Sequence, residues 1–153
     1  MIARYTRKEM GRIWSLENKF QKMLEVEIAV ARVQAKNKLI PEKAARDIAA
    51  KAKFKVARIE EIEKTTKHDV IAFVTNLAEN VGENGKYIHY GLTSSDVLDT
   101  ALSLVLREAG EEILIGVSAL EKSLSTQAKR HASTLCAGRT HGMHAEVTSF
   151  GVK

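Results

Sequence analysis

The fold is decided by the stretch SSDVLDTALSLVLREAGEEILIGVSALEKSLSTQA, residues 94–128. Apolar residues recur in it at helical steps of three and four positions: Leu98, Leu102 and Val105, then Ile113, Val117, Leu120, Leu124 and Ala128. At a rise of about 1.5 Å per residue, this pattern predicts one helix about 50 Å long. Because an ordinary globular helix is much shorter, a helix of this length needs a bundle of other helices around it.

Shorter helical patterns precede the long one. In the first of them Phe20, Leu24 and Ile28 follow Ser15, a residue type that caps helix starts. Pro41 suits the first turn of the next helix. Further stripes are formed by Ala44, Ile48 and Ala52, by Val56, Ile59 and Ile62, and by Ile71, Val74, Leu77 and Val81. With 5% aromatic residues and one proline, the composition also favours helices over strands.

The residues that begin, interrupt and end these helical patterns give further expectations. Thr6 followed by Glu9 fits a capping box at the start of the chain. Residues 83–92, with two glycines and mixed polarity, are expected to form a loop. The helical pattern restarts at about Thr148 and stops at Lys153, which predicts a new helix cut off in its first turn.

We therefore predict an all-α fold. It consists of an N-terminal helical domain over residues 1–110 and the beginning of a long-helix bundle over residues 111–153. No remaining segment is long enough to cover the apolar stripe from Ile113 to Ala128, so either other subunits bury it or the polypeptide is truncated. Truncation is the better explanation.

Composition excludes several classes of function. The net charge is +5, but the basic residues are spread along helices beside acidic ones, which argues against a nucleic-acid partner. No apolar run reaches the roughly 20 residues that span a bilayer, and the start of the chain does not resemble a signal peptide, so we expect a cytoplasmic protein without a membrane partner. The single cysteine, Cys136, is expected to be a small half-buried apolar residue.

Two polar clusters interrupt the apolar pattern: GLTSSD at residues 91–96 and GRTHGMHAE at residues 138–146. Each sets hydroxyl, guanidinium or imidazole groups beside glycines where a long apolar stretch breaks off. Helix starts at such breaks suit anions, because the first N–H groups of a helix lack partners. Thr93 and Ser94 would add hydroxyl donors for a carboxylate or phosphate. Taken alone, however, the first cluster is better explained as a well-capped helix.

The second cluster offers a proton carrier. Gly138 and Gly142 let the backbone approach a ligand, and Arg139 can hold an oxyanion. His141 belongs to the residue type that changes charge near neutral pH, although a lone histidine is more often an ordinary loop or core residue. His141 and His144 could also ligate a metal, but only Glu146 stands at a supporting spacing, so no metal site is expected.

Four motifs carry a family resemblance: Arg4-Tyr5-Thr6 with Glu9-Met10 and Ile13-Trp14-Ser15; Thr66 to Phe73; Tyr87 to Val97; and Gly138 to Glu146. Together and in this order they resemble the N-terminal third of the adenylosuccinate lyases, which belong to the fumarase/aspartase superfamily. Either polar cluster alone would indicate only the superfamily. The segment Lys67-His68-Asp69 and the start Arg4-Tyr5 are similar to the purine branch rather than to argininosuccinate lyase or fumarase.

The resemblance implies a fumarase/aspartase-like helical fold and a β-elimination without a cofactor. Fumarate would leave adenylosuccinate to give AMP, and would also leave the succinyl-carboxamide ribotide of purine synthesis. His141 is implied as the general acid that protonates the leaving amine. The implied substrate-binding residues are Arg4, Tyr5, Lys67, His68, Asp69, His89, Thr93 and Ser94. Structural support of the loop before Gly91 explains His89 equally well, Arg139 and Thr140 would hold the His141 loop in shape, and His131 has no assigned role.

The family also implies what this chain does not supply. Its catalytic base is a serine on a glycine-rich loop, expected beyond Lys153, and its active sites are assembled from three subunits of a homotetramer. The isolated chain is therefore expected to be inactive. Two alternatives remain: a helical interaction or scaffold domain whose polar clusters are only caps and turns, and another lyase of the same superfamily.

Overall fold

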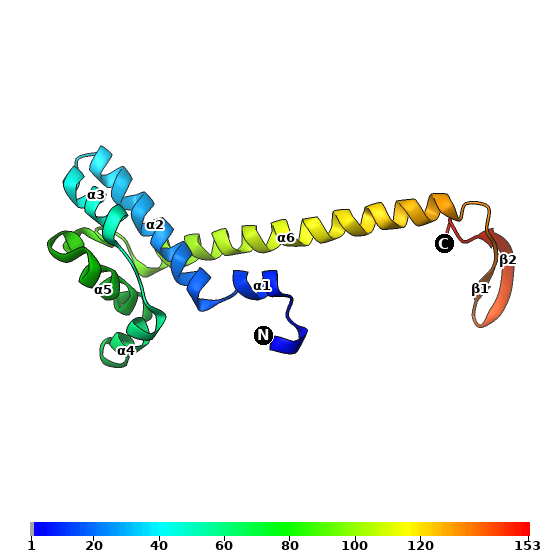
Figure 1. The fold of residues 1–153 in the computed structure, drawn as a ribbon, viewed down its shortest axis with the longest axis horizontal. Helices are drawn as coiled ribbons and strands as arrows, with labels where there is room; N and C mark the ends of the chain where they lie inside the picture. The colour runs from blue at the N-terminus through cyan, green and yellow to red at the C-terminus, as the bar shows by residue number, and fades with distance from the viewer. Residues whose placement is uncertain (1) are drawn as a thin grey trace. The chain divides into compact units, whose positions relative to one another are not determined.

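The computed structural model describes residues 2–153 and consists mainly of helices, with one two-stranded hairpin (Figure 1). In chain order the elements are η1 (Ala3–Tyr5), α1 (Lys8–Ile13), α2 (Leu16–Lys36), α3 (Glu42–Lys51), α4 (Val56–Thr66), α5 (Asp69–Val81), η2 (Gly82–Tyr87), α6 (Ser94–Arg130), β1 (Leu135–Thr140) and β2 (Met143–Ser149), where η is a 3-10 helix. The chain divides into two compact units, Met1–Ala109 and Gly110–Lys153. The all-α expectation is confirmed, with the hairpin as an addition.

The core of the first unit is built around three phenylalanines. Phe20 of α2 stacks on Phe73 of α5 with ring centroids 5.5 Å apart, and Phe54, between α3 and α4, lies 5.9 Å from Phe20. Offset and tilted aromatic pairs at such distances are favourable beyond the apolar area that they bury. The other large residues buried almost completely in this core include Met23, Ile48, Ile59, Leu77, Val70 and Val97.

Local capping chemistry explains where several helices begin. Ser15 accepts a hydrogen bond from the Asn18 N–H at 3.1 Å, so the predicted cap of α2 is confirmed. Pro41 lies just before the first residue of α3, as the N-cap. The capping box predicted at Thr6 is wrong: α1 begins at Lys8, and the Thr6 hydroxyl instead donates to the Ile2 carbonyl at 2.8 Å.

The long helix predicted from residues 94–128 is confirmed as α6, which runs without a break for 37 residues (Figure 1). Its buried residues follow one another at four-residue steps and end at Ala109: Val97, Ala101, Val105 and Ala109. Beyond them Ile113, Val117, Leu120 and Leu124 are 54–61% exposed. Residues 150–153 border Val117, Leu120 and Leu124 in a shared hollow, but they leave these side chains more than half exposed. None of the helices described is both long and apolar enough to cross a membrane.

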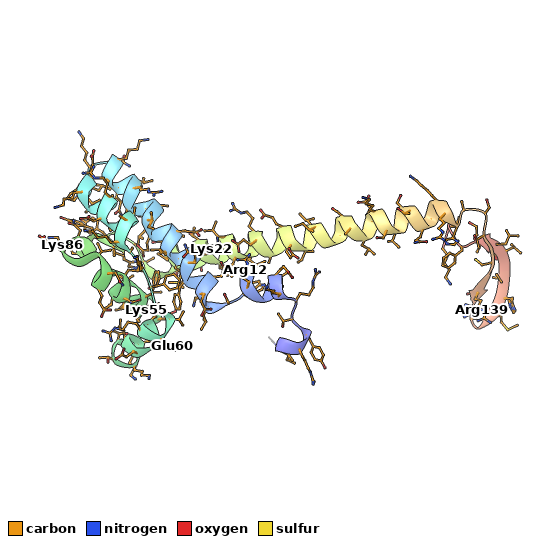
Figure 2. All side chains as sticks on the ribbon, in the orientation of Figure 1. Arg12, Lys22, Lys55, Glu60, Lys86 and Arg139 are labelled. Atoms are coloured by element: carbon orange, nitrogen blue, oxygen red, sulfur yellow. The ribbon has the colours of Figure 1, made fainter. Side chains whose placement is uncertain are left out.

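A polar network joins the first half of α6 to α2. Lys22 Nζ lies 2.7 Å from Glu108 Oε1, and Asn18 Nδ2 donates to Glu108 Oε2 at 3.1 Å. Figure 2 labels Lys22, together with Arg12 of α1, which lies 3.8 Å from the same carboxylate. The hydrogen bond from Lys22 is the main reason that the pKa of Glu108 is lowered, and it raises the pKa of Lys22 in turn.

The second unit contains the C-terminal part of α6 and the antiparallel hairpin β1–β2. The Phe150 N–H donates to the Thr134 carbonyl at 2.8 Å, and the Gly151 N–H donates to the His131 carbonyl at 3.0 Å. A Cβ at Gly151 would collide with the backbone of Ala128 and Ala132, so only glycine allows this close return of the chain to the helix.

Two sequence expectations fail at element level. The helix expected from Thr148 is wrong, because Thr148 and Ser149 end β2 and residues 150–152 form a turn. The β-branched pair Val147-Thr148 suits a strand, and the hairpin turn is too short to leave a loop signal. The loop expected over residues 83–92 is half correct, since η2 occupies Gly82–Tyr87.

Candidate functional site

His68 and its neighbours occupy the break between α4 and α5. Lys67 ends α4 in the left-handed conformation, at φ 54°, and its side chain is exposed. His68 is the N-cap of α5, where its Nδ1 accepts a hydrogen bond from the Ile71 N–H at 3.3 Å. Asp69 follows in the first turn, with Oδ1 3.6 Å from the same Nδ1. Because Nδ1 uses its lone pair on an N–H donor, a neutral His68 carries its proton on Nε2 and offers a donor there.

His89 is held by a carboxylate from α2. Glu27 Oε2 accepts from the His89 backbone N–H at 3.0 Å, and Glu27 Oε1 lies 2.6 Å from His89 Nδ1. The Glu27 side chain is 1% exposed, whereas that of His89 is 21% exposed. A buried carboxylate is costly unless it is paired, so His89 compensates the burial of Glu27 while Glu27 fixes the ring.

Thr93 and Ser94 stand at the start of α6, whose first residue is Ser94. Asp96, in the first turn, accepts from the Thr93 N–H at 2.8 Å through Oδ2. This contact occupies the Thr93 backbone donor, whereas the Ser94 and Ser95 N–H groups have no acceptor among residues 2–153, as is usual in the first turn of a helix. Thr93 is exposed and Ser94 is half-buried, so both hydroxyls lie near the surface.

Arg4 and Tyr5 are neighbours in η1, and both side chains are exposed. The Arg4 guanidinium carbon lies 4.8 Å from the centre of the Tyr5 ring. A guanidinium stacked on an aromatic ring keeps its N–H donors directed outward, which suits contact with a phosphate.

His141 stands at the tip of the hairpin. Thr140 pairs with Met143 in the ladder, so His141 and Gly142 alone form the turn between the strands. Their φ angles are 48° and 75°, and positive values at both central residues are what a type I′ hairpin turn requires. The His141 side chain is exposed, and no hydrogen bond joins its imidazole to another of the residues 2–153.

The strands below the tip explain the neighbouring motif residues. Arg139, labelled in Figure 2, pairs with His144, and the register slips between Ala137 and Arg139. The slip leaves Gly138 at a bulge, where a Cβ would come within 3.0 Å of the Glu146 carbonyl oxygen. Arg139 and Thr140 thus shape the turn through the backbone ladder, with exposed side chains. His131 packs edge-on against Phe150, with centroids 5.3 Å apart, which is a structural contact.

Three of the predicted site residues share an unusual backbone. Non-glycine residues with positive φ in the described part of the chain are Lys38, Lys67, His89 and His141. For a residue with a Cβ this conformation costs about 1–2 kcal/mol, and such costs concentrate at functional sites. Lys67 is the C-cap of α4 and His141 lies in the hairpin turn, so local geometry accounts for two of the three.

The predicted residues fall into both units. His68 lies beside Asp69, and Arg4 lies on Tyr5, within the first unit; His141 belongs to the second. An apolar hollow in the first unit, lined by Ile13, Trp14, Leu16, Met23, Leu98 and Leu102 among others, contains none of them. Across residues 2–153, no three His, Cys, Asp or Glu side chains lie close enough together to hold a metal.

Sequence reasoning missed Glu27. The signal was present, because position 27 continues the apolar series Phe20, Leu24 and Ala31 at helical spacing. An acid at a core position of an amphipathic helix indicates a buried polar contact.

Comparison with known proteins identifies the class. The lyase family matches residues 3–153, so this chain belongs to the lyase family. It is similar to the adenylosuccinate lyases of Aquifex aeolicus, at 54% identity, Synechocystis sp., at 52%, and Bacillus subtilis, at 46%. Each match covers 100% of this chain and 36% of the relative, so the chain spans about a third of the length of the curated relatives that it matches. The resemblance drawn from the four motifs is confirmed.

Solved structures show the same fold. A fumarate lyase from Mesorhizobium sp. matches with a TM-score of 0.89 and 32% identity, over 96% of this chain and 36% of that one. A 3-carboxy-cis,cis-muconate lactonizing enzyme from Pseudomonas putida matches with a TM-score of 0.88 and 33% identity, over 97% of this chain and 36% of that one. The fold therefore serves more than one chemistry, and the choice among them depends on the site.

Proposed function

We propose that this chain is part of an adenylosuccinate lyase. The observation that carries the proposal is the identity of 46–54% to adenylosuccinate lyases along the entire chain, against 32–33% to the solved fumarate lyase and lactonizing enzyme. The substrates would be adenylosuccinate and the succinyl-carboxamide ribotide. The products would be fumarate with AMP, or fumarate with the carboxamide ribotide.

The reaction is a β-elimination whose demands match the chain's residues. A base takes the proton from the carbon β to nitrogen, the C–N bond breaks, and the electron pair of that bond leaves on nitrogen. Because a purine amine is a poor anionic leaving group, an acid must protonate it, a contribution of about 10² to 10⁴ in rate. We assign this acid to His141, whose exposed ring on a two-residue turn is free to meet a substrate.

Charge that builds on the substrate carboxylate needs preorganised donors. Thr93 and Ser94 supply hydroxyl groups at the start of α6, where the N–H groups and the helix dipole also favour negative charge. Arg4 on Tyr5 is assigned to the nucleotide phosphate. Lys67, His68, Asp69 and His89 are assigned to the rest of the substrate, with His68 as an Nε2 donor.

The proposal includes an assembly. The base would come from outside this chain, and a homotetramer would combine residues of several subunits at each site. Support comes from the exposed apolar residues Ile113, Val117 and Leu120 of α6, since exposed apolar stripes of this kind are normally covered in an assembly. A cytoplasmic location belongs to the same proposal.

The decisive test is an assay of fumarate release by the full-length gene product, with adenylosuccinate as substrate. His141→Ala is expected to lower kcat by about 10² to 10⁴ while the substrate Kd changes little. His144→Ala, on the neighbouring strand, is the matched control and should retain activity. Full turnover by His141→Ala would show that His141 is not the general acid.

A second assay, which follows lactone formation from a carboxymuconate, tests a second candidate. The match to the muconate lactonizing enzyme favours ring closure, in which a carboxylate adds to a double bond of the same molecule. Activity toward a carboxymuconate and none toward adenylosuccinate would establish that candidate. Absence of turnover on either substrate, in a correctly assembled protein, would favour a non-catalytic helical scaffold.

A further inference from the structure

A buried carboxylate on α2 has no role in the chemistry assigned above. Glu27 is 2% exposed, and it is the one charged residue with so little exposure among the described residues. Both of its oxygens are used by one residue: Oε2 by the His89 N–H and Oε1 by His89 Nδ1. The carboxylate thus contacts both the backbone N–H and the ring nitrogen Nδ1 of His89.

This two-point contact fixes the protonation pattern of the ring. A carboxylate only accepts hydrogen bonds, so the 2.6 Å contact places a proton on His89 Nδ1. In the neutral ring Nε2 is then an unprotonated acceptor. His68 is the opposite case, since its Nδ1 accepts from the Ile71 N–H and its Nε2 carries the proton. Two histidines assigned to one substrate therefore present opposite hydrogen-bonding groups.

The loop that carries His89 is anchored to the same helix a second time. Gln34 Nε2 donates to the Tyr90 carbonyl at 2.6 Å. Glu27 and Gln34 are seven residues apart, which is two helical turns, so they lie on one face of α2. The anchored His89 has a φ of 63°, and Gly91, just after the second anchor, has a φ of 71°; the loop then leads into Thr93 and α6.

We infer that Glu27 is a positioning residue that locks His89 in the Nδ1–H tautomer and presents Nε2 as an acceptor to an N–H or O–H group of the substrate. The part that concerns the substrate rests on the proposed function. The part that concerns the ring does not, because it follows from contacts within the first unit.

The tautomer is measurable without substrate. In the chain labelled with ¹⁵N-histidine, long-range ¹H–¹⁵N spectra at about pH 9, well above the ordinary imidazole pKa of about 6.5, should show His89 protonated on Nδ1 and His68 on Nε2. Glu27→Gln should reverse His89 alone. The amide oxygen would accept from the His89 N–H and the amide NH₂ would donate to Nδ1, so the proton moves to Nε2.

Two control variants separate a reversed His89 tautomer from a general loosening of the loop that carries it. Glu25→Gln removes an exposed carboxylate of the same helix and should leave both tautomers unchanged. Gln34→Leu frees the Tyr90 carbonyl and should loosen the loop without reversing His89. A wild-type His89 protonated on Nε2, or an unchanged ring in folded Glu27→Gln, would overturn the inference. Because the wild-type spectrum is itself a test, the inference stays falsifiable even if a variant fails to fold.

Kinetics of the full-length gene product test the substrate part. Reversal of the tautomer turns an acceptor into a donor, so Glu27→Gln should raise KM about 10- to 100-fold with a much smaller change in kcat. Glu27→Asp keeps the charge and should recover part of the loss. A wild-type enzyme without fumarate release would defeat the proposed function and leave the tautomer result intact. An active enzyme in which the tautomer reverses and KM does not change would overturn the substrate part alone.

Discussion

His89 and His141 are both assigned to the substrate, yet the chain holds them by different means. Glu27 contacts both the backbone N–H and the ring of His89, and the His89 side chain is mostly buried. His141 is placed by backbone geometry alone, on a two-residue turn with its ring exposed. The contact between Glu27 and His89 is thus complete within one folded unit, whereas the His141 ring makes no hydrogen bond with another of the residues 2–153.

The largest expected effect is on kcat, and it comes from introducing the same glycine-to-valine substitution into the His89 loop and the His141 turn. Gly91 and Gly142 have φ angles of 71° and 75°, and at neither would a Cβ meet any atom within 4 Å. Gly142→Val should displace the unsupported His141 and lower kcat of the full-length gene product by up to about 10² to 10⁴, as if the acid were removed. Gly91→Val should cost much less, because Glu27 still holds His89. Equal losses of kcat would contradict the comparison.

Removal of the two rings should affect stability differently. His89→Ala leaves Glu27 buried without a hydrogen-bond donor for its Oε1, a change that costs about 1–3 kcal/mol. His141→Ala removes an exposed ring and should change the free energy of unfolding by no more than about 0.5 kcal/mol. Urea unfolding of the chain measures both. The double variant Glu27→Leu, His89→Ala should recover much of the lost stability, and failure to do so would show that Glu27 has another partner.

Attachment of the hairpin is tested at Gly151. Gly151→Ala forces a Cβ into the backbone of Ala128 and Ala132, and overpacking of this kind costs about 1–3 kcal/mol. Hydrogen exchange should show faster exchange in residues 134–151 and unchanged exchange in the first unit. Gly116→Ala is the matched control, because its Cβ meets nothing and should stabilise α6 by up to about 1 kcal/mol.

The smallest expected effect is the loss of folding stability when the pH is lowered. Lys22 lowers the pKa of Glu108 and Arg58 lowers the pKa of Glu79, chiefly through hydrogen bonds, and both carboxylates belong to the first unit. A lowered folded pKa contributes stability above the unfolded value of about 4.3, and that stability is lost as the pH falls through the folded value. Urea midpoints should therefore decline below about pH 4.3. Glu108→Gln should make that decline shallower, and an unchanged slope would exclude its ion pair as a cause.

The sequence was most informative where structure is local. The helical period in residues 94–128 and the Ser15 cap follow from residues within a few positions of one another. The hairpin was missed because His-Gly is a weak turn signal and because strand pairing depends on a partner segment. Glu27 was noted in no motif, since its partner His89 is 62 residues away.

The residues alone determined the helical class, the family and the chemical groups present, because periodicity and motif order are properties of neighbouring positions. Tertiary structure decided which of those groups have fixed geometry. It paired Glu27 with His89, placed His141 on a tight turn, and set three assigned residues in the left-handed region. The physical reason is that burial and the cost of an unpaired buried charge arise only when distant segments pack together.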